Sequence, residues 1–153
     1  MKLGDVAQSM VIRDGIGWVV VNNSHVVFAI DIHTFKEVGR ITNFTSPRYI
    51  HFLSDEKAYV TQIWDNRIFI VNPKKYQITG YIECPNMTME SGSTEQMVQY
   101  GKYVYVNCWL PTLDASLGLR PRGPPSPSGE GFWKPPLLPL YITYKKISGF
   151  TNS

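Results

Sequence analysis

The side chains in this sequence that best suit chemistry are one tryptophan and the polar residues on either side of it. Trp64 stands in a short polar segment between Gln62 and Asp65. An aromatic ring in a polar turn has no obvious place in a core, and an exposed indole beside amide groups suits stacking on a flat ligand or a sugar. The alternative is that Trp64 packs across a seam between repeats, while Asp65 only shapes a turn.

Residue types that serve catalysis or metal binding do not occur at useful spacings. His25, His33 and His51 lack the spacing of metal ligands, so we expect surface or hydrogen-bonded histidines. Cys84 and Cys108 fit no zinc motif, and we expect two thiols rather than a disulfide. No serine stands in a G-x-S-x-G segment, and no glycine-rich phosphate loop is present. The sequence therefore predicts no catalytic residue, no metal and no cofactor.

The elements that would position these side chains come from a repeat. Residues 18–41 (WVVVNNSHVVFAIDIHTFKEVGRI) align with residues 58–82 (AYVTQIWDNRIFIVNPKKYQITGYI), and a third copy starts at Tyr103. The alignment pairs Asp31 with Asn72, Phe28 with Phe69, Phe35 with Tyr76, Gly39 with Gly80 and Ile41 with Ile82. A repeat of roughly 40–46 residues that is rich in β-branched and aromatic residues is typical of β-propeller blades.

Apolar runs between turn signals predict four antiparallel strands in each blade and almost no helix. Because Asp31 and Asn72 occupy the same position at the end of the third strand, we expect them to cap turns rather than act in catalysis. The charges at 55–56 and 74–75 are expected to be solvated turn charges. Strands are predicted at 10–13, 18–22, 26–31, 37–41, 48–52, 58–62, 68–72, 77–83, 95–99 and 103–108.

The predicted fold is all-β: an incomplete β-propeller of four-stranded antiparallel blades with a Pro/Gly-rich irregular C-terminal tail. The expected boundaries are a domain at 1–109, with blade 1 at about 8–42, blade 2 at about 47–84 and half of a third blade at about 95–109, and a tail at 110–153. Twelve of the 29 residues at 111–139 are proline or glycine, a density that no meander strand tolerates. We expect a disordered or extended tail, with one candidate strand at 137–147 (LLPLYITYKKI).

The abrupt change of composition after Trp109 has two readings. A propeller gene read out of frame beyond this point would produce it. The alternative is a natural short protein that self-associates, because an open stack of blades leaves apolar faces and strand edges exposed.

The charge distribution and the apolar runs bear on partners and location. The formal net charge is +3, yet residues 1–109 hold ten basic and ten acidic side chains, so the excess lies in the tail. A neutral repeat region argues against nucleic acid, which needs clustered cations. No segment has the length of a signal peptide's apolar run or of a membrane helix, so the chain as written is expected to be cytoplasmic.

The blades resemble the YVTN-repeat (YncE-like) β-propeller family over about residues 5–109. The residues that carry the resemblance are Tyr59-Val60-Thr61-Gln62, Ile70-Val71-Asn72 and Gly80-Tyr81-Ile82 in blade 2, Val19-Val20-Val21-Asn22, Ala29-Ile30-Asp31 and Glu37-Val38 in blade 1, and Tyr105-Val106-Asn107-Cys108 in the third copy. Family propellers close with about seven blades, whereas this chain supplies about two and a half.

This resemblance implies a noncatalytic ligand-binding or scaffold propeller fragment of an exported bacterial protein, in the periplasm or at the surface, where some relatives capture nutrients such as cobalamin. Ligands usually bind the face that carries the turn between the second and third strands and the links between blades. The residues expected on that face are Asn22, Asn23, Ser46, Arg48, Gln62, Trp64, Asp65, Asn107 and Trp109. The alternatives are a self-associating interaction module and a fragment of a quinoprotein-like dehydrogenase or lactonase, although two and a half blades cannot supply the ring of ligands that such enzymes need.

Overall fold

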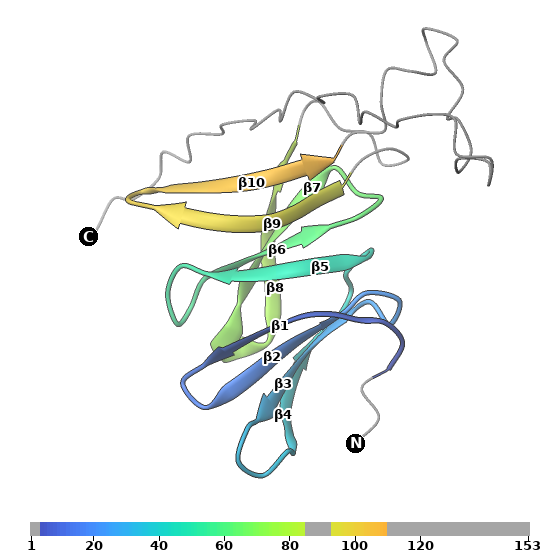
Figure 1. The fold of residues 1–153 in the computed structure, drawn as a ribbon, viewed down its shortest axis with the longest axis vertical. Helices are drawn as coiled ribbons and strands as arrows, with labels where there is room; N and C mark the ends of the chain where they lie inside the picture. The colour runs from blue at the N-terminus through green and yellow to red at the C-terminus, as the bar shows by residue number, and fades with distance from the viewer. Residues whose placement is uncertain (1–3, 85–92, 110–153) are drawn as a thin grey trace, which may run out of the picture.

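The described residues of the computed structural model, 4–84 and 93–109, form three antiparallel sheets stacked one on another (Figure 1). The first sheet holds β1 (Ala7–Arg13), β2 (Ile16–Val21), β3 (Val26–Asp31) and β4 (Glu37–Ile41). The second holds β5 (Pro47–Phe52), β6 (Ala58–Gln62), β7 (Arg67–Asn72) and β8 (Gln77–Glu83), with the 3-10 helix η1 (Pro73–Lys75) between β7 and β8. The third is a hairpin of β9 (Ser93–Tyr100) and β10 (Tyr103–Trp109).

Every sheet is a meander in which strands adjacent in sequence pair with each other. The first strands of the sheets are also neighbours, because β5 contacts both β1 and β9. This arrangement gathers the first strands together, as in a β-propeller, whose blades surround a central channel. The described chain is therefore an all-β, incomplete β-propeller that contains two four-stranded blades and the first hairpin of a third.

Side chains at the end of the third strand shape the next turn in both blades. The Asp31 carboxylate accepts the backbone N–H groups of His33 (2.9 Å) and Thr34 (2.7 Å). These bonds hold the pKa of Asp31 below its ordinary value, and the bond from Thr34 has the largest effect. The Asn72 carbonyl oxygen accepts the N–H of Lys75 (3.0 Å) in the same way. The prediction that Asp31 and Asn72 cap turns is confirmed.

Apolar residues on one face of each blade form the largest core. Trp18, Val20 and Val27 of the first blade pack against Val60 and Phe69 of the second. Burying a side chain of this size contributes roughly 1.5–3 kcal/mol. The other face of the second blade packs against the β9–β10 hairpin. The buried residues at this second seam are Tyr59, Ile68, Met97 and Val104.

One contact between the blades depends on a missing side chain. A Cβ atom at Gly39 would lie only 2.3 Å from Cζ of Tyr76, so glycine alone lets this ring lie against β4. The repeat equivalents make no such contact within the described residues: Phe35 is 74% exposed, and Gly80 has only Ile70 within 4 Å. The ring-on-glycine contact therefore joins blade 1 to blade 2.

The strand predictions agree well with the structure. The strands predicted at 26–31, 37–41, 58–62 and 77–83 are confirmed at both ends. The predicted strand at 10–13 is too short, because β1 begins at Ala7 and polar residues continue its ladder without an apolar signal. The turn expected at 73–75 forms one turn of 3-10 helix.

Two further expectations concern the tail and the membrane. The tail at 110–153 and the candidate strand at 137–147 lie outside the described residues. Within the described ranges, no helix has the length and apolarity to cross a membrane.

Candidate functional site

The turns that carry the predicted ligand-binding residues lie together at one end of the blades. We call this end the Trp64 rim; it comprises residues 22–25 between β2 and β3, 42–46 between β4 and β5, and 63–66 between β6 and β7. The Ile63 N–H donates to the Ser46 carbonyl (2.9 Å), and a ring nitrogen of His25 bonds to the Thr45 carbonyl. Turns of both blades thus form one connected surface.

Gln62 lies inside this rim rather than on it. Its side chain is fully buried, and its carbonyl oxygen accepts the backbone N–H groups of Thr45 (3.1 Å) and Ser46 (2.9 Å). The Gln62 N–H donates to the Thr94 hydroxyl (2.9 Å), which links β6 to β9. Its side-chain Nε2 has no hydrogen-bond partner among the described groups. Gln62 therefore holds the link between blades in place.

Asp65 is likewise committed to structure. Its carboxylate is fully buried and binds the guanidinium of Arg67 through Nε (2.8 Å) and Nη2 (2.8 Å), while the Thr45 hydroxyl donates to it (2.6 Å). Burial by itself would raise the pKa of Asp65, but the bonds from Arg67 and Thr45 outweigh it and leave the pKa below its ordinary value. Asp65 is thus an ionised residue that fastens the β6–β7 turn.

Asn22 and Arg48 join strands of different blades. The nearly buried Asn22 amide donates to the Pro47 carbonyl (3.1 Å). Arg48 pairs with Glu95 (3.0 Å) and donates to Gln8 (2.8 Å), so it connects β5 with β9 and β1. Both side chains therefore stabilise the seams.

Three of the predicted residues remain exposed on the surface. Trp64 is 50% exposed, and its φ of 59° lies in the left-handed region, which bulky residues rarely adopt. Asn23 is exposed and donates to Asp5 (3.3 Å), and Asn107 near the end of β10 is exposed as well. Trp109 ends β10, but its side chain lies outside the described set.

The histidines and cysteines lie where the sequence placed them. His25 and His33 are in turns and His51 is in β5, and the described residues contain no cluster of His, Cys, Asp and Glu arranged for a metal. Cys84 and Cys108 form no disulfide. Burial, followed by the charge of Cys84, raises the pKa of Cys108 to about 11. Cys108 is therefore a protonated thiol at neutral pH rather than a nucleophile.

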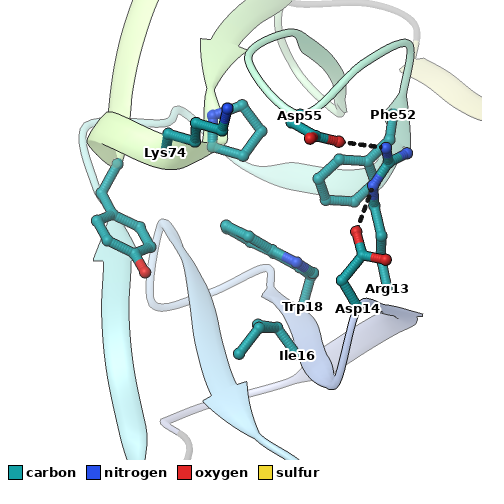
Figure 2. A pocket seen from close by; sticks show the side chains of 9 residues that line it. Arg13, Asp14, Ile16, Trp18, Phe52, Asp55 and Lys74 are labelled. Carbon is teal, nitrogen blue, oxygen red and sulfur yellow. Dashed lines mark hydrogen bonds and ion pairs between the residues drawn. The ribbon is translucent and has the colours of Figure 1, made fainter.

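A pocket lies at the opposite end of the blades, where the sequence predicted no site. It lies at the seam between the first two blades (Figure 2), and its volume is about 230 Å³. We call it the Trp18 pocket. It is lined by Ile16, Trp18, Phe52, Pro73 and Tyr76, with Arg13, Asp14, Asp55 and Lys74 as its charged residues.

Three aromatic rings meet in this pocket. Trp18 lies edge-on to Phe52, with ring centroids 5.3 Å apart, and its ring centroid is 6.0 Å from that of Tyr76. The guanidinium of Arg13 lies over the Phe52 ring at 5.3 Å and bonds to Asp55 (2.6 Å) and Asp14 (3.2 Å). The pocket therefore combines aromatic walls with ionised side chains at its mouth.

The pocket does not follow from the repeat pattern. The Asp55 and Lys74 segments were expected to be solvated turn charges, and both side chains are indeed more than half exposed. Only the packing of blade 1 on blade 2 brings these turns over Trp18. Aromatic residues near the strand ends of both repeats were the available signal.

No family model and no curated protein matches this chain. Among solved structures, dihydro-heme d1 dehydrogenase NirN in complex with DHE has a TM-score of 0.49 at 14% identity, over 66% of this chain and 22% of that one. Kuenenia stuttgartiensis hydrazine synthase has a TM-score of 0.45 at 13% identity, over 68% of this chain and 36% of its own. KlHsv2 with loop 6CD replaced by a Gly-Ser linker has a TM-score of 0.44 at 13% identity, over 67% of this chain and 34% of that one. This chain thus spans only a minor part of each, and no chemistry follows from the similarity.

Proposed function

We propose that this chain is a noncatalytic ligand-binding or scaffold part of a β-propeller, and that its ligand binds the Trp64 rim. The observation that carries the proposal is the indole of Trp64, which is half exposed in a turn with a left-handed backbone. Such a conformation costs on the order of 1–3 kcal/mol and persists only where surrounding contacts impose it. Six other non-glycine residues of the described chain share this conformation, the exposed Phe35 among them, so Trp64 is distinguished by the contacts that hold its turn in place.

The surroundings of Trp64 supply those contacts. Asp65 is fully buried and bound to Arg67, and the N–H of Ile63 is bound to the Ser46 carbonyl. The turn is therefore rigid on both sides of the indole. A rigid exposed ring loses little conformational entropy when it stacks on a ligand, and that favours binding. Asn23 is the exposed amide that the first blade adds to this surface.

The resemblance to YVTN-repeat (YncE-like) propellers narrows the proposal. It supports an exported bacterial protein of the periplasm or cell surface that captures a nutrient, and cobalamin is the first candidate. A corrin ring or a sugar offers the flat face that an exposed indole binds.

The test is to titrate the chain with cyanocobalamin and with a panel of oligosaccharides and to measure binding by isothermal titration calorimetry. Replacing Trp64 with alanine should weaken the binding of the active compound by about 1–3 kcal/mol, as for an aromatic hot spot. Phe35→Ala is the matched control, because Phe35 is also an exposed aromatic but lies outside the Trp64 rim. Equal affinity of the wild type and the Trp64→Ala variant would remove Trp64 from the site.

A further inference from the structure

The outer face of the first blade repeats a surface that lies inside the molecule in the second blade. Residues that pair side by side across the strands form the same row in both blades. The row is Met10, Val19, Phe28 and Arg40 in the first blade and Ile50, Val60, Phe69 and Tyr81 in the second. Ile50 and Phe69 belong to the core between the two blades. The matching row of the first blade therefore lies on the face that points away from the second blade.

The first residue of this row differs in exposure among the three sheets. Ile50 is 4% exposed and packs against the first blade. Met97 is its counterpart in the hairpin, because it pairs with Val106, and it is 7% exposed against the second blade. Met10 of the first blade is 60% exposed. An apolar side chain that is buried between blades elsewhere is thus open to solvent here.

The adjoining row shows the same contrast. The corresponding pairs of the two blades are Ile12 with Gly17 and Phe52 with Ala58. Phe52 packs edge-on to Trp18 of the preceding blade, with ring centroids 5.3 Å apart. Its counterpart Ile12 is exposed.

The turn after the third strand adds an exposed ring to this face. The Tyr76 ring lies on Gly39 of the preceding blade. Its repeat equivalent, Phe35, has the same left-handed backbone, with a φ of 54° against 52°, but its ring is exposed. We call Met10, Ile12 and Phe35 the docking surface, because each is the exposed counterpart of a residue by which the second blade packs on the first.

One cation lies on this face without blocking it. The Arg40 guanidinium lies over the Phe28 ring at 5.0 Å. In the second blade, Arg67 lies over Phe69 in the same way at 5.1 Å. Phe69 still packs against Phe44 in the core between the blades, with ring centroids 5.8 Å apart. A guanidinium over this ring is therefore compatible with a docked blade.

The opposite end of the stack also carries exposed apolar side chains (Figure 1). The β9–β10 hairpin uses Met97 and Val104 to pack on the second blade. Because successive residues of a strand point to opposite faces, Val98 and Tyr100 point away from that blade. Both are exposed. Exposed apolar patches of this kind mark interaction surfaces.

Strand pairing identifies what the outer face of the hairpin corresponds to. Val98 pairs with Tyr105, as Val11 pairs with Trp18 in the first blade. Trp18 is the residue that receives Phe52 of the following blade. The outer face of the hairpin is thus the kind of surface on which a following blade packs. The docking surface is the kind of surface that packs there, so the two ends of the stack are complementary.

We propose that this chain associates head to tail, with the docking surface of one copy packed on the outer face of the β9–β10 hairpin of a second copy. The contact between the first two blades already shows how such surfaces pack. A head-to-tail contact forms a ring where the rotation closes and an open filament where it does not. Because propeller blades surround a central channel, this rotation closes, and association stops at a small number of copies.

The test is analytical ultracentrifugation of the whole chain over a range of concentrations, with two lysine variants. Ile12→Lys charges the docking surface and Val98→Lys charges the hairpin face, and both side chains are exposed. Each variant alone should associate at least about tenfold more weakly than the wild type, because a charge would be buried in an apolar contact. An equimolar mixture of the two should form a 1:1 dimer, since each variant keeps the surface that the other has lost.

Controls connect the result to these two faces. Trp64→Ala should leave association unchanged, because Trp64 is also exposed but lies in a turn of the second blade. Circular dichroism shows whether each variant is folded, and Met10→Lys is a second variant of the docking surface. A wild type that stays monomeric at every concentration would overturn the proposal and leave the docking surface for a blade of another chain. Association that persists in either Ile12→Lys or Val98→Lys, or a mixture that stays monomeric, would overturn it as well.

Discussion

Replacing Asp65 with alanine tests whether this predicted site residue is structural. The buried carboxylate accepts three hydrogen bonds from Arg67, two from its guanidinium and one from its backbone N–H, and a fourth from Thr45. The variant loses all four hydrogen bonds at once, so the link between the blades and the β6–β7 turn both loosen.

The magnitude follows from the burial of the two partners. A hydrogen bond to a charged group contributes about 1.5–3 kcal/mol, and bonds to one carboxylate are not additive. Breaking a fully buried ion pair costs about 3–5 kcal/mol. The Arg67 side chain is 30% exposed and also lies over the rings of Phe69 (5.1 Å) and Tyr81 (5.4 Å), so it rehydrates and keeps part of its packing. We expect Asp65→Ala to lower the free energy of unfolding by about 2–4 kcal/mol.

Urea unfolding followed by circular dichroism measures this loss as a lower midpoint at a constant m-value. Glu56→Ala is the control, because Glu56 is 67% exposed and its ion pair with Lys74 is a surface pair. It should change the free energy of unfolding by less than about 1 kcal/mol. If Asp65→Ala matches this control, the reasoning on Asp65 is refuted.

The pH dependence provides an independent check on the same residue. Because the pKa of Asp65 is lowered in the folded state, its carboxylate stabilises the fold at pH values above its ordinary, unfolded-state pKa of about 3.9. This contribution is lost as the pH falls through the lower, folded-state pKa. The stability difference between the wild type and Asp65→Asn should therefore be largest near neutral pH and shrink in acid. A difference that stays constant into strong acid would contradict the assignment.

Two other predictions concern the contact between the first two blades and the partly buried thiol of Cys108. Gly39→Ala forces the Tyr76 ring away from β4 and should lower the free energy of unfolding in urea by about 1–3 kcal/mol. Gly80→Ala is the control and should be tolerated, because no atom lies closer than 3.8 Å to a Cβ atom placed there. Equal losses in the two variants would contradict the ring-on-glycine contact. With a pKa of about 11, Cys108 should react with iodoacetamide at pH 8 on the order of 100-fold more slowly than free cysteine, as followed by mass spectrometry of its peptide. Unfolding the chain in urea should make Cys108 react at the rate of free cysteine. Fast labelling of Cys108 in the folded chain would contradict its raised pKa.

The repeat made the blades readable from the sequence, because strand length and capping are local properties. β-branched runs between turn signals predicted the first and last residues of four strands correctly. The recurrence of Asp31 and Asn72 predicted that these two residues cap turns. Where polar residues extend a strand, as at Gln8 and Ser9 in β1, the pattern gave no signal and the prediction stopped short.

The predicted ligand face shows the limit of such reasoning. Sequence position placed Gln62, Trp64 and Asp65 in one turn region but could not assign their exposure. Packing of blade on blade buried Gln62 and Asp65 fully and left Trp64 half exposed. A turn residue is a candidate ligand-binding group only if its polar atoms are not already bound, and that depends on the neighbouring blade.

The sequence alone determined which residues are equivalent, such as Phe35 with Tyr76 and Gly39 with Gly80. Only the tertiary structure decided which of these meet: Tyr76 lies on Gly39 of the preceding blade, not on Gly80 of its own. The same packing brings Trp18 and Phe52 together from different blades. The physical reason is that the repeat encodes local hydrogen bonding and alternation within a blade, whereas the pocket and the seams arise from contacts between blades whose spacing along the chain the pattern does not specify.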